Sequence, residues 1–98
     1  MNLVAVGVNH TTADVELRER LAFSTQQAQA ALASLRDVPG VCEAALLSTC
    51  NRTELYCLTD DSAPDLVAWM AERRHLSRDK IEPVLYQHQG EEALEHMM

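Results

Sequence analysis

A cysteine and an arginine, Cys50 and Arg52, are two residues apart in residues 48–54, between two apolar stretches typical of strands. A thiol in a turn is more exposed than one inside a strand, and a nearby guanidinium favours the reactive thiolate. The guanidinium also presents a planar fork that matches a carboxylate. The hydroxyls of Ser48 and Thr49 could donate to a ligand, although hydroxyls beside turns more often bond their own backbone. The pattern suits covalent chemistry on an acidic substrate.

Both central side chains also have structural explanations. Free cysteine is among the most buried residue types, so Cys50 could complete a buried strand. Arg52 could form an ion pair with Glu43 or Glu54 in place of binding a ligand. Arg52 and Glu54 would share a face of the sheet only if both lie in regular strand, because side chains alternate along a strand. The residues alone leave these alternatives open.

The two other cysteines are weaker candidates for a nucleophile. Cys57 lies inside an apolar strand, and Cys42 follows the turn at residues 39–40 without a charged partner. Three cysteines cannot all pair with one another, and no C-x-x-C spacing is present. The sequence therefore predicts neither a disulfide scaffold nor a zinc or other metal site.

Among the four histidines, His96 is the one whose predicted position could face a site at the edge of the sheet. It falls at the flank of the apolar stripe that Ala93, Leu94 and Met97 form on the last predicted helix, although an ordinary surface histidine is the alternative. His10 follows the first predicted strand and could face the same end of the sheet as Cys50.

Composition and charge limit the class of protein. A chain of 98 residues with 47% hydrophobic and 23% charged residues predicts one soluble globular domain. A net charge of −7 argues against a broad grip on a phosphate backbone, which needs a basic surface. The opening apolar run, residues 3–8, is too short to span a membrane and lacks the features of a signal peptide. We expect a buried strand in a cytoplasmic protein that does not enter a membrane.

The order of predicted elements indicates an α+β fold. Strands are expected over 3–8, 43–49, 53–59 and 83–87, and helices after Thr12, from Ser24 to 39–40, from Ser62, over 77–80 and over 91–98. Thr12 and Ser62 are expected to cap the helices that follow them, and Ser24 with Gln27 matches a capping box. Strand, helix, strand, strand, helix, strand is the split βαβ arrangement of a ferredoxin-like sandwich, an antiparallel sheet with helices on one face. The helical pattern is unfinished at residue 98, so we expect a truncated piece of a longer protein.

Several motifs resemble the N-terminal catalytic domain of bacterial glutamyl-tRNA reductase, in the same order over the whole chain. The most specific is LSTCNRTELY at residues 47–56, and the others are GVNHTTA at 7–13, LRER at 17–20, and YQHQ at 86–89 followed by Ala93 and His96. The chain is accordingly identified as a member of that family, with residues 1–98 forming its catalytic, glutamyl-tRNA-binding domain.

The resemblance implies NADPH-dependent reduction of glutamyl-tRNA to glutamate-1-semialdehyde, a step of tetrapyrrole (porphyrin) synthesis. Cys50 matches the family's nucleophile, which would hold glutamate as a thioester. Thr49, Cys50, Asn51 and Arg52 match its substrate-binding stretch, with Arg52 suited to the glutamate side-chain carboxylate. His96 matches a histidine proposed to act as acid or base.

The cofactor and most partners implied by the resemblance lie outside these 98 residues. The chain has no G-x-G-x-x-G fingerprint, so we expect NADPH to be bound by a nucleotide-binding domain beyond residue 98, which a dimerisation domain follows. The expected partners are the aminoacyl end of glutamyl-tRNA, a second subunit in a full-length homodimer, and the downstream aminomutase. No metal is expected.

Two other functions remain open on the residues alone. A ferredoxin-like fold hosts many activities, so the chain could be a ligand-binding or regulatory module in which Cys50 is incidental. Alternatively, Cys50 could be a redox-sensing thiol, which would form a reversible sulfenic acid with peroxide.

Overall fold

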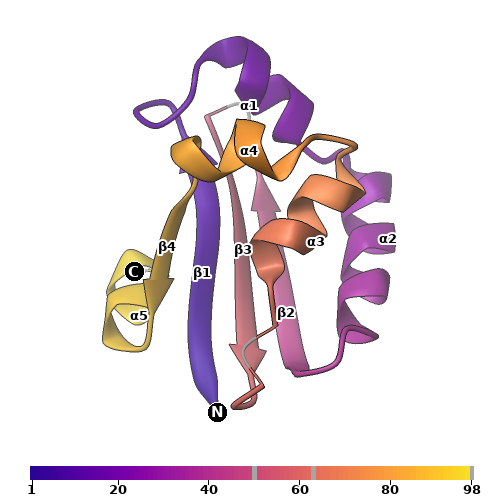
Figure 1. Ribbon diagram of the computed structural model, residues 1–98, viewed down its shortest axis with the longest axis vertical. Coiled ribbons are helices and arrows are strands. Elements are labelled where there is room, and N and C mark those ends of the chain that lie inside the picture. Colours follow the sequence, from indigo (N-terminus) through magenta and orange to yellow (C-terminus); the bar gives the residue numbers. More distant parts are fainter. Residues whose placement is uncertain (50, 63, 98) are drawn as a thin grey trace.

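A four-stranded antiparallel sheet is the centre of the fold, as the computed structural model shows for residues 1–49, 51–62 and 64–97 (Figure 1). Its strands are β1 (Asn2–Asn9), β2 (Val41–Ser48), β3 (Arg52–Thr59) and β4 (Tyr86–Gln89), in the order β2-β3-β1-β4. Every neighbouring pair is antiparallel. This order confirms the predicted ferredoxin-like α+β fold.

The helices connect the strands and cover one face of the sheet. They are α1 (Val15–Leu21), α2 (Thr25–Arg36), α3 (Leu66–Arg73) and α4 (Arg78–Ile81), followed by a 3-10 turn, η1 (Glu82–Val84). The last helix, α5 (Glu91–Met97), follows β4 and lies beside it at the edge of the sheet (Figure 1). Helices α1 and α4 lie at the end of the sheet where β2 and β3 are connected.

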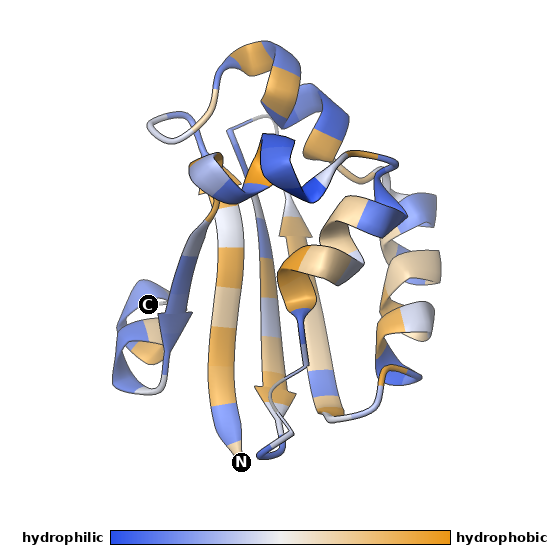
Figure 2. Ribbon diagram, in the orientation of Figure 1, coloured by the Kyte–Doolittle hydropathy of each residue, from blue (hydrophilic) through white to orange (hydrophobic). Residues whose placement is uncertain are grey.

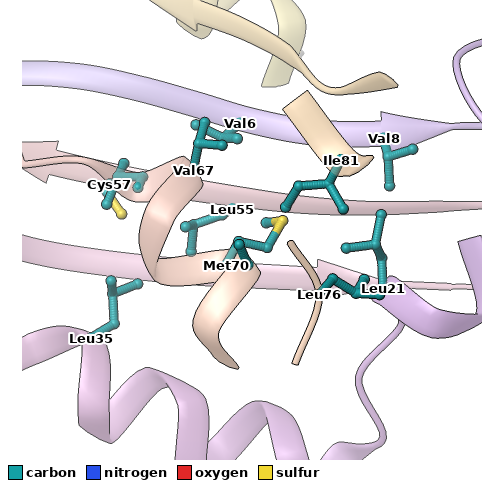
Figure 3. Packing of buried hydrophobic residues seen from close by; sticks show 12 residues of the cluster. Val6, Val8, Leu21, Leu35, Leu55, Cys57, Val67, Met70, Leu76 and Ile81 are labelled. Atoms are coloured by element: carbon teal, nitrogen blue, oxygen red, sulfur yellow. The ribbon is translucent and has the colours of Figure 1, made fainter. Parts of the chain in front are cut away.

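The hydrophobic core lies between the sheet and α2 and α3. Figure 3 shows Val6 of β1 and Leu55 of β3 facing Leu35 of α2 and Met70 of α3. Strand β1 is largely hydrophobic along its length, whereas β4 is hydrophilic (Figure 2). Because alternate residues of a strand face opposite sides, the residues between the core positions of β3 point to the other face of the sheet.

The start of α2 follows its predicted cap. Ser24 Oγ accepts a hydrogen bond from Gln27 N at 3.1 Å, and Gln27 Oε1 accepts one from Ser24 N at 2.9 Å. This capping box satisfies two backbone donors that the helix cannot satisfy itself.

Two other predicted helix caps were wrong. Helix α1 is capped by Asp14, whose Oδ1 accepts from Leu17 N at 2.9 Å, because Thr12 is already used in the turn after β1. Helix α3 is capped by Asp65 and not by Ser62, whose hydroxyl bonds Asp60. In both cases an aspartate closer to the apolar stripe takes the capping position.

The last strand and helix also differ from the prediction. Pro83 lies in the 3-10 turn, where its fixed φ is favourable and its missing N–H costs nothing, so β4 begins only at Tyr86. In α5, Ala93 is buried but Leu94 is 51% exposed, so the predicted apolar stripe is narrower than expected. Residue 98 lies outside the described residues.

Candidate active site

The connection between β2 and β3 carries the predicted nucleophile. Cys50 itself lies outside the described residues, but both sides of it are described. Thr49 N donates to Arg52 O at 2.8 Å, and Thr49 Oγ1 accepts from the backbone N–H groups of Asn51 and Arg52 at 3.3 Å each. The Thr49 hydroxyl thus bonds its own turn, which is the local alternative considered above. The roles of Thr49, Cys50 and Asn51 in substrate binding stay predictions.

Arg52 forms an ion pair with Glu54 at the start of β3, directly after this connection. Both residues lie in β3, so they share a face, and Arg52 Nε is 3.1 Å from Glu54 Oε1. The Arg52 side chain is 50% exposed, whereas the Glu54 side chain is fully buried at 0%. The ion-pair alternative is therefore confirmed for Glu54, and the exposed half of Arg52 remains accessible.

His96 reaches the same carboxylate from the other end of the chain. Its Nε2 hydrogen-bonds Glu54 Oε2, although the two residues are 42 positions apart. The His96 ring also lies against Tyr86 and His88, with ring centroids 4.9 and 4.7 Å away. His96 is therefore not an ordinary surface histidine, and the structure places it with Arg52 around one buried carboxylate.

Glu54 is the site residue that sequence reasoning missed. It was considered only as an ion-pair partner of Arg52. The available signal was an acidic residue inside the strand pattern TELYCL, at a position whose alternation excludes it from the core. A fully buried carboxylate is rare unless it is paired. The burial of Glu54 therefore indicates that its partners are specific parts of the site.

The surroundings of Glu54 keep it ionised. Burial alone would raise its pKa, but the Tyr56 hydroxyl, the His96 ring and the Tyr86 hydroxyl together lower that pKa below 4.5. Glu54 Oε1 and Tyr86 Oη have no hydrogen-bond partner of good geometry among the described residues, so Tyr86 acts on the carboxylate as a nearby dipole. In return, burial and the Glu54 carboxylate raise the pKa of Tyr56 to about 12.

Gly7 leaves the space that Glu54 occupies. A Cβ atom at Gly7 would lie 2.9 Å from Glu54 Cγ, Thr53 O and Tyr86 Oη. Gly7→Ala is therefore expected to push β1 from β3 and to lower the free energy of unfolding by about 1–3 kcal/mol, as overpacking does. Thermal unfolding followed by circular dichroism measures this. Gly90→Ala is the comparison, because its Cβ would meet nothing and only the positive φ of 60° would cost stability. Unchanged unfolding of Gly7→Ala would contradict the close contact.

The described cysteines differ sharply in burial. Burial raises the pKa of the Cys57 thiol to about 12, while Cys42 is exposed. At neutral pH we expect iodoacetamide to label Cys42 readily and Cys57 only after unfolding, because the thiolate is the reactive form. Peptide mass spectrometry of the labelled protein would show this. Fast labelling of Cys57 in the folded protein would contradict the assignment of Cys57 to the core.

The other predicted candidates lie apart from this cluster. Cys57 faces the core, and His10 is exposed in the turn after β1. Within residues 1–49, 51–62 and 64–97, no three His, Cys, Asp or Glu side chains are grouped as a metal ion would require. In the same part of the chain, no helix has the length and apolar character to cross a membrane.

Known proteins with similar sequences share one description. The family model described as Glutamyl-tRNAGlu reductase, N-terminal domain, matches residues 6–98. Glutamyl-tRNA reductase of Alcanivorax borkumensis is 76% identical and that of Shewanella halifaxensis 48% identical over all 98 residues, which span 23% of each relative. A solved structure, glutamyl-tRNA reductase from Methanopyrus kandleri, has a TM-score of 0.59 and 25% identity over 97% of this chain and 21% of its own. The chain therefore belongs to the glutamyl-tRNA reductase family and corresponds to the N-terminal domain of these enzymes.

Proposed function

We propose that this chain is the acyl-transfer domain of an NADPH-dependent glutamyl-tRNA reductase. The Cys50 thiolate attacks the ester carbonyl that joins glutamate to the tRNA 3′ end. A carbon–sulfur bond forms, the carbon–oxygen bond to the tRNA breaks, and the departing tRNA oxygen takes a proton. The observation that best supports this proposal is the cluster of Arg52 and His96 around Glu54, in the strand that begins just after Cys50.

Each group in the cluster suits one part of that reaction. Arg52 has an exposed guanidinium that can bind the glutamate side-chain carboxylate through its two terminal nitrogens, since Nε already faces Glu54. His96 is partly exposed and can hand a proton to the leaving oxygen. Thr49 and Asn51 flank the nucleophile and complete the proposed substrate-binding stretch.

A thiol suits the proposed pathway better than a hydroxyl. A thioester is more easily reduced than an oxygen ester, so glutamate held on Cys50 is ready for reduction to glutamate-1-semialdehyde. That product would place the full-length protein in tetrapyrrole synthesis.

NADPH does not fit the residues of this chain. The three glycines, Gly7, Gly40 and Gly90, are too far apart for a phosphate-binding loop, and no G-x-G-x-x-G is present. We therefore assign NADPH binding to other parts of a full-length protein and derive no reduction step here. A homodimer, contact with the downstream aminomutase and a cytoplasmic location belong to the same proposal. The net charge of −7 suits a domain that meets only the aminoacyl end of the tRNA.

A single-turnover assay tests the proposed function. Full-length protein is mixed with glutamyl-tRNA labelled in the glutamate, without NADPH, and label on the protein and free glutamate are measured after denaturation. Label that appears on the protein before free glutamate supports acyl transfer. If no label is transferred, and peroxide instead gives a reversible sulfenic acid at Cys50, the redox-sensor alternative replaces the proposal.

A further inference from the structure

The buried carboxylate of Glu54 has a contact pattern that the fold itself does not require. The hydrophobic core lies on the other face of the sheet, where Leu55 and Cys57 of the same strand point. Replacing a buried ion pair with apolar side chains often leaves a protein equally stable, so a buried charge is weak evidence for a purely stabilising role. The contacts of Glu54 therefore call for another explanation.

Glu54 divides its two oxygens between two functional candidates. Oε1 faces Arg52 Nε at 3.1 Å, and Oε2 is hydrogen-bonded to His96 Nε2. The contacts hold Arg52 Nε and His96 Nε2 in place, and they leave the other nitrogens of both side chains available to a ligand. The two terminal nitrogens of Arg52 and Nδ1 of His96 make no hydrogen bond to a described side chain.

The walls around Glu54 hold this arrangement in place. The rings of Tyr86 and His88 of β4 lie against the His96 ring in tilted orientations. The absence of a Cβ at Gly7 of β1 leaves the space beside Glu54 Cγ free. The side chain has no exposed surface, so it has little freedom to leave either partner.

We propose that Glu54 is a positioning residue that aims the Arg52 guanidinium at the substrate carboxylate and holds the His96 ring in its working orientation. This inference rests on the proposed function. Its consequence is specificity: a fixed, planar guanidinium prefers a glutamyl group, which offers a carboxylate, over a glutaminyl group, which offers an amide.

Selectivity between two acyl groups on the same tRNA tests the inference. In the full-length protein, the single-turnover rate and the half-saturating concentration are measured for tRNA charged with glutamate and for the same tRNA charged with glutamine. Glu54→Gln should lower the preference for glutamate by about tenfold, the value of one charge-assisted hydrogen bond, and should also slow the saturated rate. A merely structural role would lower both reactions equally.

Matched variants make the result specific. Glu92→Gln removes an exposed carboxylate outside the cluster, 3.2 Å from His88, and should leave the preference unchanged. The double variant of Arg52→Gln and Glu54→Gln should be no less selective than Arg52→Gln alone, because Glu54 acts through Arg52. If Glu54→Gln does not fold, Glu54→Asp keeps the charge, cannot reach both partners, and should show the same loss of preference.

The failures of the two proposals are distinguishable. Wild-type protein that takes no glutamate from glutamyl-tRNA overturns the proposed function and this inference with it. Wild-type protein that takes glutamate, with a preference that Glu54→Gln or Glu54→Asp leaves unchanged, overturns only the positioning role. Additive losses in the double variant would likewise contradict action through Arg52.

Discussion

Cys50→Ala is expected to slow transfer of glutamate from glutamyl-tRNA to the protein by a factor on the order of 10⁴ to 10⁶, the usual cost of deleting a nucleophile. Alanine is close to cysteine in size but has no atom that can attack the ester. The measurement is the single-turnover rate of the full-length variant with labelled glutamyl-tRNA.

The matched control is Cys42→Ala. Cys42 is an exposed cysteine of β2, so its removal should leave both folding and the rate unchanged. Binding of glutamyl-tRNA to the Cys50→Ala protein should persist, because the proposed carboxylate contact is still present. A Cys50→Ala protein that transfers glutamate at the wild-type rate would contradict the assignment of the nucleophile.

Arg52→Gln is expected to raise the half-saturating concentration of glutamyl-tRNA by about 10- to 100-fold, as loss of a charged hydrogen-bonding partner does. Arg52→Lys should recover only part of this loss, since an ammonium group can face Glu54 but lacks the planar fork for a second carboxylate. The concentration dependence of the single-turnover rate gives both values.

Arg78 provides the control for Arg52. It also forms ion pairs, with Asp65 and Glu82, but these are exposed and lie near the start of α4. Arg78→Gln should change stability slightly and leave the half-saturating concentration as it is. Equal effects of Arg52→Gln and Arg78→Gln would show that Arg52 has no particular place in substrate binding.

The strand pairing could be predicted from the sequence because its signals are local. Short apolar stretches before and after residues 50–52 indicated two strands, and these are β2 and β3. The capping box at Ser24 and Gln27 is also a local pattern, and it is present in the structure. The caps of α1 and α3 were less certain, since two polar residues within three positions compete for each cap.

The cluster around Glu54 could not be predicted because it depends on long-range contacts. Whether Arg52 and Glu54 share a face depends on the residue at which β3 begins, because they share one only when both lie in regular strand. The contact between His96 and Glu54 joins residues 42 positions apart. They meet because α5 packs against β4 and β1. No periodic pattern in the sequence predicts that packing.

The same cluster explains how a small domain can hold a charged site. Glu54 is fully buried but ionised, with Arg52 and His96 as partners and two tyrosine hydroxyls nearby. Because the pKa of Glu54 is lowered by folding, its ionisation stabilises the folded state above about pH 4.5, and that contribution is lost as the pH falls through the lower folded-state pKa. The arrangement is therefore intact throughout the neutral range.

The central claim is that Cys50 carries glutamate as a thioester, and peptide mass spectrometry after an acid quench tests it most directly. Full-length protein is mixed with glutamyl-tRNA in the absence of NADPH, quenched within one turnover, and digested at low pH to preserve the thioester. We expect one added glutamyl group on the peptide that contains Cys50, and hydroxylamine should remove it. Glutamyl groups found only on Cys42 or Cys57, or on no peptide while free glutamate accumulates, would contradict the claim.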